Sequence, residues 1–175
     1  MTVHSFHIFD RRGKTLFTKR YIKGSGNEDL EQLSEQRKLI FGMLFSLREL
    51  SSSLSPVDGP GDIQLVKTGA STLYNYETVS GLRFVLYTTA DTSMLSMAAL
   101  NSPAGTPLPT VENSSNMTNP AVTEKIRGAL QHIYQNIWVT FVVRSPMYKP
   151  LHPNIASTNF EAVLDSYLKG MSWFR

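Results

Sequence analysis

The four histidines are the residues of this sequence best suited to acid–base chemistry or metal binding, and their spacing favours neither. His4 and His7 are three apart in a segment typical of a strand, so strand alternation predicts opposite faces, where they cannot chelate one ion. His132 falls near the edge of an apolar helical stripe, and His152 lies among prolines. No second ligand stands at metal-site spacing from any of them. We therefore expect structural or surface histidines, no metal site and no cofactor.

Other catalytic signatures are missing from the sequence. It contains no GxSxG elbow, no GxxxxGK phosphate loop, no HExxH motif and no paired-carboxylate signature. There is no cysteine, which excludes thiol nucleophiles, thiolate metal sites and disulfides. The glycines of SPVDGPGD, residues 55–62, could cradle an anion, but a turn of this composition needs no function to exist. We expect a protein that is not an enzyme.

Basic residues gather around the first predicted hairpin, in a chain of net charge +3. The cluster could meet phosphates or an anionic membrane, although such runs usually only solvate a surface. No nucleic-acid motif or aromatic interleaving accompanies it, so nucleic acid is not an expected partner; salt-dependent binding to DNA or RNA would test that alternative. The cluster comprises Arg11, Arg12, Lys14, Lys19, Arg20 and Lys23.

Length and composition predict a single domain over residues 1–175. A chain of 175 residues that is 41% hydrophobic is long enough for one real core and too short for two. The N-terminus lacks signal-peptide features, and no apolar run approaches the roughly 20 residues that span a bilayer. Together with the absence of cysteine, this favours a cytoplasmic protein.

The first half of the chain predicts a hairpin, a helix and three strands. Residues 3–10 are apolar on both parities, as in a central strand, and a turn at residues 11–13 leads into a second strand over 14–22. Asn27 can cap a helix that runs to about Ser52. Three short strands then follow, and the last is again apolar on both faces: Ile63–Thr68, Leu73–Glu77 and Leu82–Thr89.

The second half predicts an insertion and two helices. Residues 90–122 are rich in Ser, Thr, Asn, Ala and Pro and carry few charges, which predicts a disordered insertion. A clean apolar stripe predicts a helix from about Thr123 to Val142. Thr158 and Glu161 form a capping box that starts the last helix. The order β-β-α-β-β-β-α-α indicates an α+β fold with a five-stranded antiparallel sheet.

The helix segment KLIFGMLFSLREL, Lys38–Leu50, carries more apolar surface than one core stripe needs. Phe41 and Phe45 lie roughly 100 to 140 degrees from the centre of the stripe, which makes them candidates for a protein interface. Gly42 and Ser46 would let another backbone approach. The alternative is that a loop or terminus of the chain itself covers the phenylalanines. The stripe expected to cover the sheet is Leu33, Ile40, Met43, Leu44, Leu47, Leu50 and Leu54.

Five stretches of the sequence carry a family resemblance: VHSFHIFDRRG, GMLFSLREL followed by LSP, YNYETVSGLRFVL, LQHIYQNIWVTFVV and NFEAVLDSYL. They resemble, in family order, the smallest longin-type (sedlin-like) subunit family of the TRAPP vesicle-tethering complex, TRAPP subunit 1, in a fungal-like variant with an insertion. The resemblance implies a longin-like fold, with one helix on one face of the sheet and two on the other. Profilin-like and roadblock domains have a similar element order.

The resemblance also implies a function and partners. The chain would be a non-catalytic core subunit of a complex that exchanges nucleotide on a Rab GTPase and tethers vesicles in ER-to-Golgi transport. Its partners would be a second longin-type subunit, a subunit of the other TRAPP structural class and, through the assembled complex, the Rab GTPase. It would be cytoplasmic and peripheral at the cis-Golgi and endoplasmic reticulum. The alternative is a longin-type coat or SNARE-associated trafficking adaptor.

In the longin strand order, the strand at 63–68 is an edge, and edge strands invite pairing with another chain. Pairing there would align the first helices of two such domains. The tip of the first hairpin lies away from this edge, so its basic residues rank lower for partner contact. The predicted partner interface is Phe41, Gly42, Phe45, Ser46, Ile63 and Leu65.

Overall fold

The computed structural model describes residues 1–22, 30–54, 63–69, 71–89, 120–146, 155 and 157–174, and every structural statement below concerns these. Several predictions lie outside the described residues. They are the insertion up to residue 119, the helix cap at Asn27, the 55–62 turn and the loop histidine at 152.

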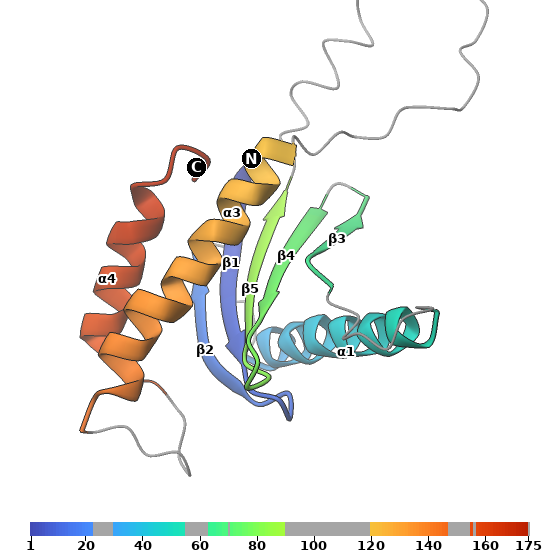
Figure 1. The fold of residues 1–175 in the computed structure, drawn as a ribbon, viewed down its shortest axis with the longest axis horizontal. Coiled ribbons are helices and arrows are strands. Elements are labelled where there is room, and N and C mark those ends of the chain that lie inside the picture. The colour runs from blue at the N-terminus through green and yellow to red at the C-terminus, as the bar shows by residue number, and fades with distance from the viewer. Residues whose placement is uncertain are drawn as a thin grey trace, which may run out of the picture.

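Five antiparallel strands form one sheet in the order β2-β1-β5-β4-β3 (Figure 1). The two strands predicted to be central from their apolar residues on both parities, β1 and β5, are neighbours in the middle of the sheet. β3 is an edge strand, as predicted, and β2 is the other edge. The strand bounds are β1 Thr2–Phe9, β2 Thr15–Arg20, β3 Leu65–Thr68, β4 Ser71–Glu77 and β5 Arg83–Thr89.

The helices cover the two faces of the sheet unequally. α1 (Leu30–Leu54) crosses one face, while α3 (Pro120–His132), its continuation η1 (Ile133–Val143) and α4 (Thr158–Lys169) cover the other (Figure 1). This confirms the α+β, longin-like arrangement of one helix against two. None of the described helices is long and apolar enough to cross a membrane.

Two hydrophobic cores lie on opposite sides of the sheet. The larger core joins β1, β2 and β5 to α3, η1 and α4 around the buried Trp138, whose ring meets Phe84 and Phe160 edge-on. The smaller core lies under α1. Its buried members are Phe9, Ile40, Leu44, Leu73 and Val85.

The second predicted helix differs from expectation in its start and its winding. It begins at Pro120, inside the residues assigned to the insertion, because proline is well suited to the first turn of a helix. From Ile133 onward it is a π-helix, and at its end the Arg144 amide donates to the carbonyl five residues back, at Val139 (3.0 Å). Because a π-helix is wound more widely than an α-helix, side chains four and five residues apart share the side that faces the sheet. The buried residues on this side are Ile133, Ile137, Trp138 and Val142.

The cap of α4 lies one residue before the predicted one. The Phe160 amide donates to Ser157 Oγ at 3.3 Å, so Ser157 rather than Thr158 is the N-cap. The predicted capping box fails because the Glu161 carboxylate forms an ion pair with Lys19 on β2 instead. Lys19 also reaches Asp165 at 3.2 Å, which ties α4 to the edge strand β2.

Candidate functional site

The core-facing line of α1 runs through Ile40 and Leu44, which are its most deeply buried residues. At 3.6 residues per turn this line is rotated by roughly 40 degrees from the predicted centre of the stripe, toward Phe41. Leu50 and Leu54, predicted to cover the sheet, are instead 54% and 74% exposed. That part of the prediction was wrong because the helix extends past the small core under its middle.

Because the core-facing line of α1 is rotated, the helix has an apolar flank that was not predicted from its sequence. Leu39 is 73% exposed and shares this side of α1 with Leu50 and Leu54. Beside Leu39, a shallow groove of about 230 Å³ opens between α1 and the β3–β4 hairpin. The sequence feature that could have indicated this flank is the recurrence of leucine at positions 39, 50 and 54 on one side of the helix. The groove is lined by Gln36, Leu39, Ile40, Met43, Thr68, Ser71, Leu73 and Tyr87.

The opposite flank of α1 carries the two predicted phenylalanines. Phe41 is half-buried: its ring lies 5.7 Å from that of Phe9, and the Arg83 guanidinium sits 5.0 Å above it. Gly13 in the β1–β2 turn touches the same ring so closely that a Cβ there would lie 2.6 Å from it. Phe45 stacks on Phe41 at 6.3 Å and remains 48% exposed. The chain therefore covers part of Phe41 itself, and Phe45 is the freer of the two.

Between the two flanks, the outer side of α1 includes two small residues. Gly42 and Ser46 are exposed, and a Cβ at Gly42 would meet nothing within 4 Å. A second backbone could therefore approach here, as the sequence predicted. Whether Phe41, Gly42, Phe45 and Ser46 contact a partner stays a prediction.

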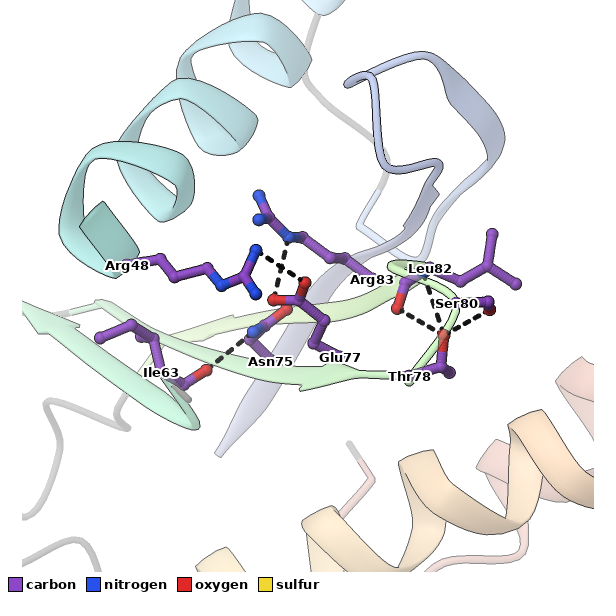
Figure 2. A network of polar contacts seen from close by, with 8 residues as sticks. All are labelled: Arg48, Ile63, Asn75, Glu77, Thr78, Ser80, Leu82 and Arg83. Atoms are coloured by element: carbon purple, nitrogen blue, oxygen red, sulfur yellow. Dashed lines mark hydrogen bonds and ion pairs between the residues drawn. The ribbon is translucent and has the colours of Figure 1, made fainter. Parts of the chain in front are cut away.

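A polar network fixes α1 and β3 to the sheet (Figure 2). Glu77 on β4 accepts from the buried Arg83 on β5 (3.3 Å) and pairs with Arg48 of α1 (3.2 Å). Two strand residues away, Asn75 Nδ2 donates to the carbonyl of Ile63 (2.7 Å), just before β3 begins. These contacts link both α1 and the start of β3 to the β4–β5 strand pair.

The predicted interface residues on the edge lie on different faces. Ile63 packs under α1 into the smaller core, whereas Leu65 turns toward the larger core on the other face. Both are half-buried, and the strand itself begins at Leu65, two residues later than predicted. If they contact a partner, it would be through the open backbone edge of the strand more than through their side chains.

The two edges of the sheet are not equivalent. Among the described residues, β3 pairs only with β4. The β2 edge is partly occupied, because the Ile155 amide donates to the Leu16 carbonyl at 3.4 Å and Lys19 is bound to α4. Within the described part of the chain, β3 is thus the edge strand whose outer side has no strand beside it.

The histidines form no metal centre within the described residues, where no group of three metal-binding side chains occurs. The prediction that His4 and His7 point to opposite faces was wrong, however. β1 has a bulge against β5, with Val3 opposite Thr88 and Ser5 opposite Tyr87, and both histidines line the same cavity on the α1 face. The extra residue inverts the alternation that the sequence argument relied on.

His7 is held as a neutral, structural histidine. Its Nε2 bonds Ser5 Oγ at 2.8 Å and its Nδ1 bonds Thr18 Oγ1 at 3.2 Å. Burial, reinforced by the charge of nearby Arg37, lowers its pKa from 6.5 to about 4. His132 stacks on the Tyr167 ring at 4.6 Å on the far side of the molecule. Both contacts agree with structural roles.

Known proteins match this sequence over nearly its whole length. The model of the Sybindin-like family matches residues 3–105. Trafficking protein particle complex subunit 1 of Homo sapiens and of Rattus norvegicus is 30% identical over 175 residues, covering 99% of this chain and 97% of the relative. The subunit BET5 of Saccharomyces cerevisiae is 29% identical over 187 residues, covering 98% of each chain. The chain belongs to the Sybindin-like family.

Proposed function

We propose that this chain is a non-catalytic core subunit of a TRAPP-type vesicle-tethering complex that acts in ER-to-Golgi transport. The names of its relatives, which match almost end to end, support this assignment. The single structural observation that supports it best is the pair of apolar flanks on α1 beside β3, the last strand of the sheet in the described part of the chain. Large apolar side chains left exposed together on one element are a common mark of a protein interface.

The second longin-type subunit would occupy the β3 edge and the outer side of α1. Edge pairing would extend the sheet through β3. The neighbouring α1 helices would then meet at the small residues Gly42 and Ser46. Leu39 and its groove would receive apolar side chains of the partner. Phe45 on the other flank would serve as a further anchor, since exposed aromatic side chains often anchor interfaces.

In the assembled complex, the chain would contribute binding surface for a Rab GTPase. Such a platform needs no bond chemistry: it binds the opened, nucleotide-free GTPase more tightly than the nucleotide-bound form, and the difference in affinity drives nucleotide release. A subunit of the other TRAPP structural class would complete the platform. The chain would work in the cytoplasm, held peripherally at the cis-Golgi and endoplasmic reticulum through its partners.

Serine substitutions on exposed apolar side chains test this proposal. Leu39→Ser and Phe45→Ser should reduce co-purification of TRAPP subunits from cells at least about tenfold when combined, the effect of losing roughly 1.4 kcal/mol of binding. Phe41 is left intact because it also packs on Phe9. The matched control is Val143→Ser on η1, where an equally exposed apolar side chain lies on the opposite face (50% exposed).

Two results would refute the interface. Unchanged recovery of TRAPP subunits with the double variant, at an unaltered melting temperature, would exclude α1 as the contact. Equal loss with Val143→Ser would show a general effect of removing apolar surface. Recovery of no TRAPP subunit with the unmodified chain would refute the function itself.

A further inference from the structure

Two turns, the one that joins β1 to β2 and the one that joins β4 to β5, project from the same end of the sheet (Figure 1). The turns touch each other, because a Cβ placed on Gly81 would lie 2.9 Å from the Cβ of Arg11. The partner surface proposed above lies on α1 and the β3 edge, so it does not include this end. We call residues 10–14 and 78–82 together the double-turn tip.

Val79, at the apex of the β4–β5 turn, is the most exposed large apolar side chain among the described residues, at 110% of the reference exposure. A single exposed apolar residue is common on protein surfaces and needs no function by itself. What distinguishes Val79 is the backbone that holds it and the charge that surrounds it.

The turn under Val79 is fixed by hydrogen bonds that centre on the buried Thr78 (Figure 2). The Leu82 amide donates to Thr78 Oγ1 at 3.0 Å, and the Gly81 amide donates to the Thr78 carbonyl at 2.9 Å. Gly81 has φ 81°, which glycine adopts without strain. Since valine is also stiff about its first side-chain bond, an apolar group is presented outward with little further ordering to be done on binding.

The structure divides the basic cluster predicted around the first hairpin. Lys19 is paired with α4, Arg20 lines the cavity under α1, and Lys23 lies outside the described residues. The exposed members that remain at the double-turn tip are Arg11, Arg12 and Lys14. None of these three side chains forms an ion pair with another described residue.

The carboxylates beside the double-turn tip already have partners. Asp10 Oδ1 accepts from the backbone amides of Arg12 (2.8 Å) and Lys14 (2.7 Å), so this carboxylate closes the β1–β2 turn. Glu77 is paired with Arg48 and Arg83 on the α1 side of the sheet. Residues 10–14 therefore carry three cations against the one carboxylate of Asp10, next to an exposed apolar apex.

We propose that the double-turn tip contacts an anionic membrane surface, with its three basic side chains among the lipid headgroups and Val79 inserted between them. Basic residues near an anionic leaflet supply electrostatic attraction, and an inserted apolar side chain adds burial. Long cations that no other group holds suit the diffuse charge of a bilayer, whereas an apolar socket on a protein would have to order each of them at an entropic cost.

This inference does not depend on the proposed assembly role, because it concerns the chain alone and a different end of the molecule. It assigns to the chain a direct contact with lipid, in addition to any attachment through partners. The sequence indicated the basic cluster but not its apolar apex, since the contact between the two turns joins residues that are about seventy positions apart in the chain.

Flotation of the full chain with vesicles tests the proposal. We expect binding to phosphatidylcholine vesicles that contain phosphatidylserine and none to phosphatidylcholine alone, with binding weakened by added salt. Replacing Arg11, Arg12 and Lys14 together with Gln should lower the partition coefficient roughly a hundredfold, because each basic side chain contributes about fivefold near an anionic surface. The matched control replaces three exposed basic residues of the helical layer with Gln: Lys125, Arg127 and Arg144.

Fluorescence tests the insertion of the apex separately from charge. With the anionic vesicles, the emission of a Val79→Trp variant should move to shorter wavelength, and that of Val143→Trp on η1, another exposed apolar position, should not. Val79→Ser should lower the partition coefficient about fivefold, as expected when one apolar side chain is lost from the membrane interface. An unaltered melting temperature shows that each variant is folded.

Three results would overturn the proposal. The first is equal binding to vesicles with and without phosphatidylserine, and the second is an equal loss with the control triple variant, which would show only an effect of net charge. The third is loss of TRAPP subunits with Val79→Ser when the chain binds no vesicles, which would assign the double-turn tip to a protein. If the chain binds anionic vesicles as expected but recovers no TRAPP subunit, the proposed function fails and this inference stands.

Discussion

His7 lies under α1 with 2% of its surface exposed and is neutral in the folded chain. Its folded pKa of about 4 is below the ordinary 6.5, so the unfolded chain binds more protons between these values and stability rises with pH. The contribution is complete above pH 6.5 and lost as the pH falls toward 4. Urea unfolding across this window should show a loss of about 3 kcal/mol attributable to His7.

The contribution of His7 can be separated from that of other groups by comparing variants. His7→Gln should flatten the pH dependence of the unfolding free energy between pH 4 and 6.5. His132→Gln replaces an exposed histidine and serves as the matched control. The same slope for His7→Gln and the unmodified chain would show that His7 is protonated without cost in the fold.

Alanine substitutions at two glycines of positive φ distinguish the cost of backbone strain from the cost of steric crowding. Gly13 has φ 83° and faces the Phe41 ring, whereas Gly69 has φ 55° and a Cβ there would meet nothing within 4 Å. Gly69→Ala should therefore cost only the backbone term, about 1 kcal/mol, and Gly13→Ala at least about 2 kcal/mol. Thermal unfolding measures both. Equal losses would mean that Phe41 moves aside freely, and the contact between the turn and α1 would then be loose.

At the scale of elements, the start of α4 provides a direct choice between two caps. Ser157→Ala removes the hydroxyl that accepts from the Phe160 amide and should cost about 1 kcal/mol, while Thr158→Ala should stay within about 0.5 kcal/mol. Chemical unfolding of the two variants in parallel distinguishes them. A larger loss at Thr158 would restore the capping box that the sequence suggested.

Element order, the first hairpin and the central position of β1 and β5 could be predicted from the sequence, because they follow from apolar parity and turn residues that are local. The edge position of β3 was implied only by the family resemblance. The side of α1 that contacts the sheet could not be predicted. The stripe predicted for it contains seven apolar positions over a wide arc, and only the position of the small core beneath Ile40 and Leu44 decides which of them are buried. Likewise, a bulge such as the one at His4 depends on a neighbouring strand, so alternation alone assigns the wrong face.

The candidate interface could be predicted only in part for the same reason. Phe45 is exposed as expected, since it lies far from the core stripe. Phe41 is partly covered by Phe9 and by the turn at Gly13, which is distant in the sequence but close in space, so the helix pattern alone could not indicate the contact. Leu39 was missed because the predicted stripe was centred nearer to it than the observed core line is, which placed Leu39 beside the core and not on an exposed flank. The outcome favours Leu39 and Phe45 as the first residues to test.

At the scale of the whole molecule, the sheet separates a large core from a small one, and the two should open independently. α1 rests on a handful of apolar side chains, whereas α3, η1 and α4 share the core around Trp138. Native-state hydrogen exchange should therefore find α1 amides exchanging at a lower free energy of opening than those of α3 and α4. Equal protection of all helices would show that the Arg48–Glu77–Arg83 network makes the fold one cooperative unit.

The inequality of the two sheet edges has a consequence for the size of any assembly. A sheet that can add strands at both ends can polymerise, whereas one with a single accepting end closes after one addition. Here Ile155 and the attachment of α4 obstruct the β2 end, whereas no described strand lies beyond β3 at the other end. Association through β3 is thus expected to stop at a pair, which gives a complex of fixed composition and not a fibre.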